Sequence, residues 1–410
     1  MPPFHRADLP NGLTVVAEPM PGVRSLAMTL LLPAGLASQP ADRQGVAPLL
    51  AEMVCRGAGG RDARAHCDAL DRLGVQRSTE PQRRFSRLGA LMMSPHAGEA
   101  LPLLFDMVRR PSLEDAALGP SVDLATQAID ALDDEPQRRV MLELGRRHFP
   151  EPMGRSPLGV RAHLEATTAD DVRNFWSERF VAGGSILAFA GCYDWDQLLA
   201  AVTRQLGDWT GAAALAEPTG DAEGGVGHET GDSTQVHIAA AYPAVPLTDP
   251  RRVAQQAAVA VLSGGMSGRL FTEVREKRGL VYAVYAGYQG QKDRGDVLAY
   301  AGTTTPRAQE TLDVLTAELR RLSQGVDESE FQRAVVGMKS RLVMQGESTR
   351  ARAAAIASDV HVFGRPRTLA EAADEVDALT LDELNAFVAD HPVGEITVVT
   401  LGEQPLAVPA

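Results

Sequence analysis

Cysteine is scarce in this chain, and its scarcity excludes two kinds of site. Among 410 residues the cysteines are Cys55, Cys67 and Cys192, and no two of them have a C-x-x-C spacing. An odd, widely separated set neither builds a disulfide framework nor supplies a cysteine zinc site. We therefore expect buried thiols that contribute to packing.

Positive charge and long apolar runs are also lacking. The chain has 40 Lys and Arg against 53 Asp and Glu, a formal net charge of −13, and no basic block. This balance disfavours nucleic acid and anionic membrane surfaces as partners. No apolar run approaches the ~20 residues that span a bilayer. The N-terminal sequence MPPFHRADLPNGLTVV lacks the features of a secretory signal, so we expect no membrane partner and a cytoplasmic location.

The length and the composition indicate two domains joined by a linker. A chain of 410 residues is too long for a single core and suits two domains of about 200 residues each. Residues 211–232 are rich in Gly, Ala and acidic residues and lack aromatic residues, which is typical of an interdomain linker. We predict an N-terminal domain over 1–210 and a C-terminal domain over 233–410.

The ends of the two halves repeat each other. TADDVRNF (168–175) and TLDELNAF (380–387) share a Thr helix cap, two acidic residues and a Phe at matching places. Each is followed by a short apolar strand that closes on glycine, ILAFAG and ITVVTLG. Mixed strands and helices in two similar halves predict two related α+β domains.

Several short motifs follow one another along the chain. They include NGLTVV near the N-terminus, LPLLFDMVRRPSL, DDEP and SPLG in the first half, and GGMSGRLFTEVREKRGLVYAVYA in the second. In this order they resemble the insulinase, or pitrilysin-like, family of zinc metallopeptidases. The resemblance implies two α+β domains, each a mixed sheet covered by helices, with a pseudo-twofold relation. Together they would form a clam-shell half around a peptide cavity.

The resemblance also shows that the zinc motif has been lost. Active members carry H-x-x-E-H on a helix, with two His ligands and a Glu that acts as the base. The two His positions correspond here to Pro48 and Glu52, the base to Ala51, and the third ligand falls at or beside Ala128. One carboxylate does not hold zinc, and no two of the nine His residues have an i, i+4 spacing. We expect no metal and no cofactor in this chain.

The segment QRSTEPQRRF in the first half departs from the family as well. Active members use the corresponding edge strand to pair with the backbone of the substrate. Here Pro81 removes a backbone donor from that edge. The sequence therefore argues against peptide pairing in the first half.

The second half retains the motif RLFTEVREKRGLVY, which contains Arg275 and Tyr282. We expect Arg275 near the end of a helix and Tyr282 on the following strand. By resemblance, this pair donates hydrogen bonds to the substrate carbonyl across from zinc. A plainer interpretation pairs Arg275 with Glu273 or Glu276 and makes Tyr282 a residue at the edge of the core.

Gly264 and Gly265 precede this motif in the sequence SGGMSG. The segment lacks the lysine and the spacing of a phosphate-binding P-loop. We expect the two glycines to permit a tight turn with positive φ and a close approach of the chain.

The leading hypothesis is a catalytically incomplete subunit of a heterodimeric zinc peptidase. An H-x-x-E-H-bearing homologue would hold the zinc, and this chain would present Arg275 and Tyr282 to the peptide substrate. The alternative is a peptide-binding or scaffold protein of the same fold without a catalytic partner, as a homodimer or in another complex. A third possibility is an enzyme of another type that uses Glu52 or the carboxylates at 133–135, although adjacent carboxylates usually form a solvated face.

Overall fold

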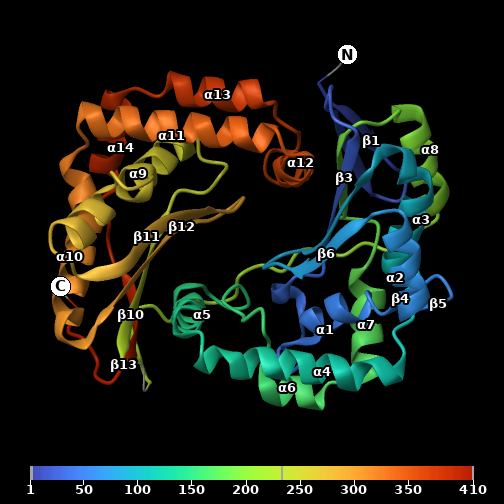
Figure 1. Cartoon of the computed structure of the whole chain (residues 1–410), viewed down its shortest axis with the longest axis horizontal. Coiled ribbons are helices and arrows are strands. Elements are labelled where there is room, and N and C mark those ends of the chain that lie inside the picture. The colour runs from blue at the N-terminus through green and yellow to red at the C-terminus, as the bar shows by residue number, and fades with distance from the viewer. Residues whose placement is uncertain (1–2, 232–233, 409–410) are drawn as a thin grey trace. The chain divides into compact units, whose positions relative to one another are not determined.

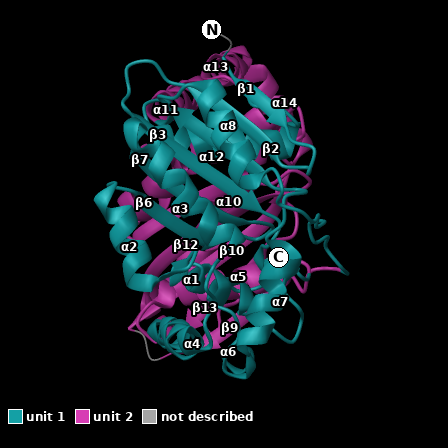
Figure 2. Ribbon diagram, turned by 90° about the vertical axis from the view of Figure 1, so that its right-hand side faces the viewer, with its two compact units in different colours: residues 1–131, 151–220, 345–366 teal, residues 132–150, 221–344, 367–410 magenta. Residues whose placement is uncertain are grey.

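The computed structural model describes residues 3–231 and 234–408 and divides into two compact units (Figure 2). The units do not follow a single cut in the sequence, because each combines most of one half with a short segment of the other. Residues 232 and 233, where the predicted linker ends and the predicted second domain begins, lie outside the described residues. Unit 1 comprises 1–131, 151–220 and 345–366, and unit 2 comprises 132–150, 221–344 and 367–410.

Unit 1 contains a six-stranded mixed sheet with the order β1-β2-β8-β3-β7-β6 (Figure 1). Neighbouring strands are antiparallel except β2 and β8, which run parallel. The strands are β1 His5–Asp8, β2 Thr14–Pro19, β3 Ser25–Leu32, β6 Gln76–Pro81, β7 Ser86–Met93 and β8 Ile186–Gly191, with a small β4 Gly57–Ala58 and β5 Arg61–Asp62 pair. The helices are α1 Val46–Met53, α2 Ala63–Arg72, α3 Ala97–Arg109, α4 Asp115–Asp130, α6 Arg161–Ala166, α7 Ala169–Arg179, α8 Trp195–Leu206 and α12 Thr349–Phe363.

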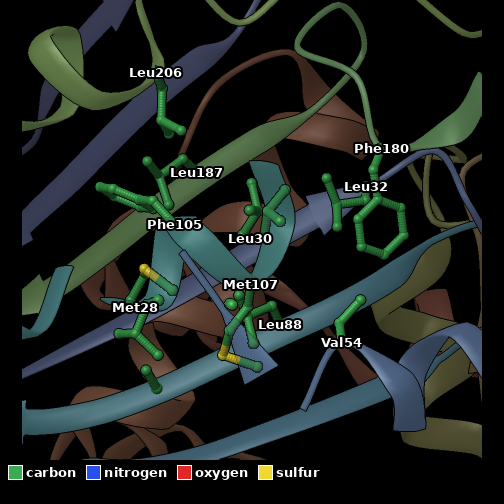
Figure 3. Close-up of a cluster of buried hydrophobic side chains, with 14 of the residues drawn as sticks. Met28, Leu30, Leu32, Val54, Leu88, Phe105, Met107, Phe180, Leu187 and Leu206 are labelled. Carbon is green, nitrogen blue, oxygen red and sulfur yellow. The ribbon is translucent and has the colours of Figure 1, made fainter. Parts of the chain in front are cut away.

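Alternating side chains separate the two faces of this sheet. On β3, Met28 and Leu30 point into the main core of the unit, whereas Leu31 points to the opposite face. The main core lies between the sheet and helices that include α1, α3 and α8. Figure 3 shows part of this core, in which Met28, Leu30, Leu32, Val54, Leu88, Phe105, Met107, Phe180, Leu187 and Leu206 are labelled.

The opposite face of the sheet is covered by α12, which contacts β2, β3, β7 and β8. Ile356 and Val360 of α12 pack with Val16 of β2. The buried Arg352 donates from Nε to Glu18 Oε2 over 2.8 Å. Burial raises the pKa of the Glu18 carboxyl, and the hydrogen bond from Arg352 partly opposes that shift. A helix from the second half of the sequence thus completes the first unit.

Unit 2 contains a five-stranded sheet with the order β11-β12-β10-β13-β9, in which β13 and β9 alone of the paired strands run parallel. This order matches β6-β7-β3-β8-β2 of unit 1, including the position of the parallel pair. The strands are β9 Val226–Thr230, β10 Gln235–Ala244, β11 Val281–Gly290, β12 Gly295–Thr304 and β13 Thr397–Gly402. The helices are α5 Pro136–His148, α9 Arg252–Ser263, the π-helix η4 Phe271–Glu276, α10 Ala308–Arg321, α11 Glu328–Gly346, α13 Leu369–Ala378 and α14 Leu381–Asp390.

Strand β9 lies within the segment that the composition identifies as a linker. It pairs with β13 from Val226 to Thr230. By its place in the sheet it is the counterpart of β2, the strand formed by the NGLTVV sequence. The composition gives no sign of this strand because β9 contains few apolar residues of its own. Its stability comes from pairing with β13.

Helix α5, from the first half of the sequence, lies against β10 and β13 of unit 2. At its end His148 is buried, with Nε2 2.9 Å from Asp296 Oδ1 and Nδ1 3.0 Å from Thr397 Oγ1. Arg294 donates from Nε to both carboxylate oxygens of Asp296, over 2.8 and 3.0 Å. The exchange of helices between the halves is therefore reciprocal, and each exchanged helix is fixed by buried charged groups.

The repeat expected from the sequence is present in the structure. Thr168 caps α7 and Thr380 caps α14, each in a capping box with the acidic residue three positions later. The helices are followed by the buried strands β8 and β13. The prediction of two related α+β units, each with a mixed sheet covered by helices, is confirmed. Within residues 3–231 and 234–408, no helix has the length and apolarity needed to cross a bilayer.

Candidate functional site

The positions that correspond to the zinc motif lie on α1 of unit 1. The helix starts after Gly45, whose φ of 130° a residue with a Cβ would rarely adopt. Pro48 is tolerated because it stands in the first turn, where no intrahelical partner awaits its missing N–H. Ala51 is buried, and its carbonyl oxygen accepts a 2.8 Å hydrogen bond from Thr79 Oγ1 of β6. Apolar packing and this bond to β6 therefore hold the helix.

The remaining carboxylate of the motif is engaged by an arginine that follows the end of α1. Glu52 accepts a 3.0 Å hydrogen bond from Nε of Arg56, one turn later. Ala128 lies on α4, and α4 packs against α1. The structure thus brings together the two helices that carry the four motif positions. A proline, two alanines and an ion-paired glutamate do not fit a zinc ion. Among the described residues, no three His, Cys, Asp or Glu side chains form a group that could hold a metal ion.

Strand β6 is the outer strand of the unit 1 sheet, next to α1. Pro81 is its last residue and is paired with Ser86 of β7. Arg77 and Glu80 add charges of both signs to a strand of six residues. A short edge with charges and a proline resists the addition of another strand.

Arg275 lies in the π-helix η4, directly before β11 in the sequence. Its guanidinium carbon is 4.9 Å from the ring centroid of Phe271. Glu273, a candidate partner, is engaged instead by Lys277 and Arg278, over 2.7 and 2.8 Å. These hydrogen bonds, that from Lys277 first, lower the pKa of Glu273. The backbone carbonyl of Arg275 accepts a hydrogen bond from Gly279 N over 3.0 Å. Within the described part of the chain, its guanidinium forms no hydrogen bond and no ion pair, so the side-chain donors are available.

Tyr282 stands at an irregular point of β11. The pairing with β12 joins Val281 to Thr303 and Ala283 to Gly302, so Tyr282 is the extra residue of a β-bulge. The side chain is 71% exposed. Its hydroxyl forms no hydrogen bond with any residue that the structure describes. Tyr282 is therefore not a packed residue at the edge of the core, and the bulge directs its phenol outward.

An open pocket of 690 Å³ lies beside Tyr282, entirely within unit 2. Its floor consists of residues of β10, β11 and β12, and its wall is the first turn of α5 with the residues before it. Arg275 is not among the residues that line it. The lining residues are Asp134, Glu135, Pro136, Gln137, Arg138, Met141, Gln235, His237, Tyr282, Ala283, Tyr285, Tyr300 and Gly302.

A chain of polar and aromatic side chains crosses the pocket floor. His237 Nδ1 is 2.8 Å from the hydroxyl of Tyr300, and the ring of Tyr300 lies 5.5 Å from that of Tyr285. Gln137 donates to the hydroxyl of Tyr285 over 3.3 Å. Burial lowers the pKa of His237, which is therefore uncharged at neutral pH. Burial also raises the pKa of Tyr300 to about 12, so its phenol keeps its proton.

The pair Gly264 and Gly265 differs from the expectation. Neither residue is among those with positive φ, and Gly264 has φ −74° as the C-cap of α9. The expected positive φ is therefore wrong. Close approach does apply at Gly264, because a Cβ there would lie 2.3 Å from the carbonyl oxygen of Ala260.

The sequence pointed to Tyr282 and, under the third possibility, to the carboxylates at 133–135, of which Asp134 and Glu135 line the pocket, but not to the other pocket residues. His237, Tyr300 and Gln137 come from three separated segments, and only the pairing of β10 with β12 and the placement of α5 bring them together. One signal was present, since Tyr282 and Tyr285 lie close together in the sequence LVYAVYAGY. The bulge at Tyr282, between Val281 and Ala283, has no signature in the sequence.

Comparison with known proteins identifies the family. The model of insulinase (peptidase family M16) matches residues 14–159, and that of the peptidase M16 inactive domain matches residues 166–338. An uncharacterized zinc protease of Bacillus subtilis is 24% identical, over 92% of this chain and 93% of its own. The crystal structure of a peptidase M16 inactive domain from Pseudomonas fluorescens has a TM-score of 0.85 at 21% identity, with 99% of each chain covered.

A second similar structure is a chain of Complex III2 from Candida albicans. It has a TM-score of 0.83 at 19% identity and covers 97% of this chain and 96% of its own. At these identities the solved structures show the fold alone, whereas the two family models together extend over most of the sequence. The chain belongs to the insulinase family, peptidase family M16.

Proposed function

We propose that this chain is the catalytically incomplete subunit of a heterodimeric zinc peptidase. A homologous partner with an intact H-x-x-E-H motif holds the zinc, and this chain contributes Arg275 and Tyr282 to the binding of the substrate carbonyl. The substrate is a peptide.

One observation carries the proposal, namely the opposite condition of the two motifs. In unit 1, Pro48, Ala51 and Ala128 offer no ligand atoms, and Glu52 is ion-paired with Arg56. In unit 2, Arg275 is exposed with its donors available, and a β-bulge presents the phenol of Tyr282 to solvent beside a large pocket. This opposite condition of the two motifs is what a division of one active site between two chains requires.

The chemistry of this chain is hydrogen-bond donation. The guanidinium of Arg275 supplies charged N–H donors, and the phenol of Tyr282 supplies one O–H donor. Directed at a peptide carbonyl, they stabilise the negative charge that develops on its oxygen during attack. When bound on the partner, zinc supplies the activated water.

The test is a cleavage assay with the co-expressed zinc-bearing homologue from the same cell and a quenched fluorescent peptide. Arg275→Ala and Tyr282→Phe should each lower kcat by about 100-fold to 1,000-fold, because each removes one donor to the developing charge. Arg278→Ala is the matched control, since Arg278 bonds Glu273 and is not part of the donor pair. An unchanged kcat in both variants would refute the role of the pair.

The second candidate function is that of a scaffold or peptide-binding subunit without catalysis. A chain of Complex III2 from Candida albicans shares the fold, which supports a structural role within a larger assembly. This function predicts a stable complex with a partner that is not a peptidase. It also predicts that Arg275→Ala and Tyr282→Phe change no cleavage rate.

A further inference from the structure

Another pocket of unit 2 lies between the end of α9 and the middle of α11 (Figure 1). It has a volume of 150 Å³ and shares no lining residue with the pocket beside Tyr282. One wall is the loop from Gly264 to Gly268, and the opposite wall is one face of α11. The SGGMSG segment, which takes no part in the proposed function, therefore encloses a cavity of its own.

Two arginines of α11 face this cavity across a glycine. Arg333, Gly337 and Arg341 line the pocket and follow one another at intervals of four residues, so they lie on one face of the helix. The Cα atoms of the two arginines are about 12 Å apart along the helix axis. A Cβ at Gly337, midway between them, would meet no atom within 4 Å apart from its chain neighbours and the adjoining helix backbone. The space over Gly337 is therefore open to a ligand that both guanidiniums can contact.

Neither arginine has a carboxylate partner among the described residues. Arg333 donates to the hydroxyl of Ser329, and Arg341 forms no hydrogen bond with any residue that the structure describes. The acidic side chain on the pocket wall, Glu330, is occupied by Arg269, whose Nε and a terminal nitrogen donate to it over 2.6 and 2.7 Å. Three arginines against one glutamate leave two positive charges at the pocket.

Glu330 cannot compensate the two arginines of the pocket. Its Oε2 also accepts a hydrogen bond from Asp327 N over 3.1 Å. Burial acts to raise the pKa of Glu330, but the hydrogen bonds from Arg269 and Asp327 N outweigh it and lower that pKa. The carboxylate is thus ionised and already bound on the side away from the cavity's free donors.

The loop wall carries further donors without partners. The N–H groups of residues 265–267 and the hydroxyl of Ser267 form no hydrogen bond with any residue that the structure describes. The loop is closed by a 3.0 Å hydrogen bond from Gly268 N to Gly265 O. A Cβ at Gly268 would lie 2.8 Å from the carbonyl oxygen of Leu262, so this tight course depends on glycine.

We propose that this pocket binds a phosphoryl dianion, as free phosphate or as the phosphate of a small monoester, between Arg333, Arg341 and the loop at 264–268. Such a site is independent of the proposed peptide cleavage. Two uncompensated positive charges match the charge of the dianion, and guanidiniums form charge-assisted hydrogen bonds with phosphate oxygens. Donors on two opposite walls suit a tetrahedral anion better than a planar carboxylate, which a single guanidinium satisfies.

The site differs from a P-loop in the source of its positive charge. A P-loop carries its own lysine, which the SGGMSG segment lacks. Here the charge comes from α11, more than sixty residues after the loop in the sequence. The motif alone therefore gives no sign of an anion site.

The first experiment measures the binding of radiolabelled inorganic phosphate to the purified chain by equilibrium dialysis at about 0.15 M salt, where diffuse attraction is screened. The net charge of −13 repels anions in general, so saturable binding reports a local site. We expect a dissociation constant of about 0.1–1 mM, as suits a ligand of five heavy atoms held by two guanidiniums. Arg333→Gln and Arg341→Gln should each weaken binding about tenfold.

Lys339→Gln is the matched control for these two variants. It removes the same charge from the same helix, but Lys339 is paired with Asp377 and does not line the pocket. Its affinity for phosphate should stay within about twofold of the unaltered chain, because screening weakens the effect of a distant charge.

Gly337→Glu blocks the site from within the chain. The new carboxylate stands one turn from each arginine, and the loss of a glycine from a helix favours folding. Phosphate binding should fall by more than about tenfold, because the carboxylate takes up the donors that the ligand needs. Gly337→Ala adds a methyl group in open space and should stay within about twofold.

Amide NMR spectra of the unmodified chain locate the ligand without any variant. Addition of phosphate should shift the signals of residues 265–267 and of Gly337, with one dissociation constant that agrees with dialysis. The signal of Gly302, in the pocket beside Tyr282, should not move.

Glycerol phosphate and acetate are the comparison ligands. Binding of glycerol phosphate as tight as that of phosphate would identify the phosphoryl group of a monoester as the ligand, and binding of phosphate alone would identify the free ion. Acetate that binds as tightly as phosphate would overturn the proposal in favour of a carboxylate site. Absence of saturable phosphate binding below about 10 mM, or equal loss in Arg341→Gln and Lys339→Gln, would also overturn it.

Discussion

Units 1 and 2 share one strand order, yet their equivalent surfaces have diverged in opposite directions. The outer strand β6 carries charges and a proline, whereas its counterpart β11 carries neither and is longer. Beside β6, the helix that corresponds to a zinc-binding element has its carboxylate neutralised by an arginine. Beside β11, the phenol of Tyr282 remains in solvent. The buried residues preserve the strand order that the two sheets share. The exposed side chains on and beside the edge strands β6 and β11 can change without disturbing that order.

Helix α1 illustrates how packing and chemistry separate. Val46, Leu49, Leu50 and Met53 are buried in the core of unit 1 and hold the helix in place. The former ligand positions on this helix, Pro48 and Glu52, lie among them without belonging to that core, and Ala51, at the position of the base, is buried outside the cluster. Replacement of ligands by Pro, Ala and Glu therefore removes the metal while the helix survives.

The largest effect is expected when zinc ligands are restored at the degenerate motif of unit 1. The triple variant Pro48→His, Glu52→His and Ala128→Glu restores three ligands on the packed pair α1 and α4. It should hold about one zinc per chain after dialysis, against less than about 0.1 for the unaltered chain, because zinc needs several ligands at once. Elemental analysis by mass spectrometry measures the content. Pro48→His alone is the control. A triple variant that binds no zinc would show that α1 and α4 do not hold the three side chains at the distances that zinc coordination requires.

The next effect concerns the helices exchanged between the halves. Asp296→Asn removes the charge that faces His148 and Arg294 and replaces one of the two acceptor oxygens by an N–H donor that faces the donors of its neighbours. We expect a loss of about 3–5 kcal/mol in the free energy of unfolding, measured by urea denaturation with circular dichroism. Asp130→Ala breaks the exposed ion pair with Arg161 and should stay within about 1 kcal/mol.

Breaking the Arg352–Glu18 pair of unit 1 tests whether its contribution to stability is smaller than that of the Asp296 cluster in unit 2. Arg352→Met removes the partner of Glu18, whose pKa burial already raises, so protonation of the carboxyl relieves part of the loss. We expect about 2 kcal/mol, less than for Asp296→Asn. The tryptophans Trp176, Trp195 and Trp209 all lie in unit 1, so their fluorescence follows its unfolding. A loss as large as that in unit 2 would contradict the difference between the two clusters.

The smallest effect is a dependence on pH. Because the folded pKa of Glu18 is raised, the folded chain binds the proton more tightly than the unfolded chain does. The stability from this group is complete below the unfolded pKa of about 4.5 and is lost as pH rises through the folded pKa. Glu18→Gln should abolish this decline, as seen by tryptophan fluorescence in urea at a series of pH values. An unchanged slope in the variant would assign the decline to another group.

Much of the fold follows from local patterns in the sequence. Breaks at Pro111 and Pro136 separate the helices α3, α4 and α5, and Pro136 is the first residue of α5. The Thr caps at 168 and 380 mark the repeat, because a capping box requires particular residues at fixed spacing. Arg275 and Tyr282 were placed on a helix and the following strand, as the structure has them, although the helix is a π-helix.

The remainder depends on contacts between distant segments. The sequences of α5 and α12 do not specify which sheet each helix covers, because α5 buries His148 and α12 buries Thr349 and Arg352 beside apolar residues. Strand β9 exists because β13 offers it a parallel partner. The pocket beside Tyr282 needs β10, β11, β12 and α5 together, so no local pattern could reveal it.

The return of α12 to the first sheet has a consequence for synthesis on the ribosome. Strand β8, the last of that sheet, ends at Gly191, and its covering helix starts only at Thr349. At ribosomal elongation rates this interval lasts on the order of ten seconds. Throughout it, the face that bears Val16, Leu31 and Ile186 lacks its covering helix. A nascent polypeptide truncated before α12 would therefore expose this apolar face to chaperones, and a stop codon in that interval would yield an aggregating fragment rather than a folded first unit.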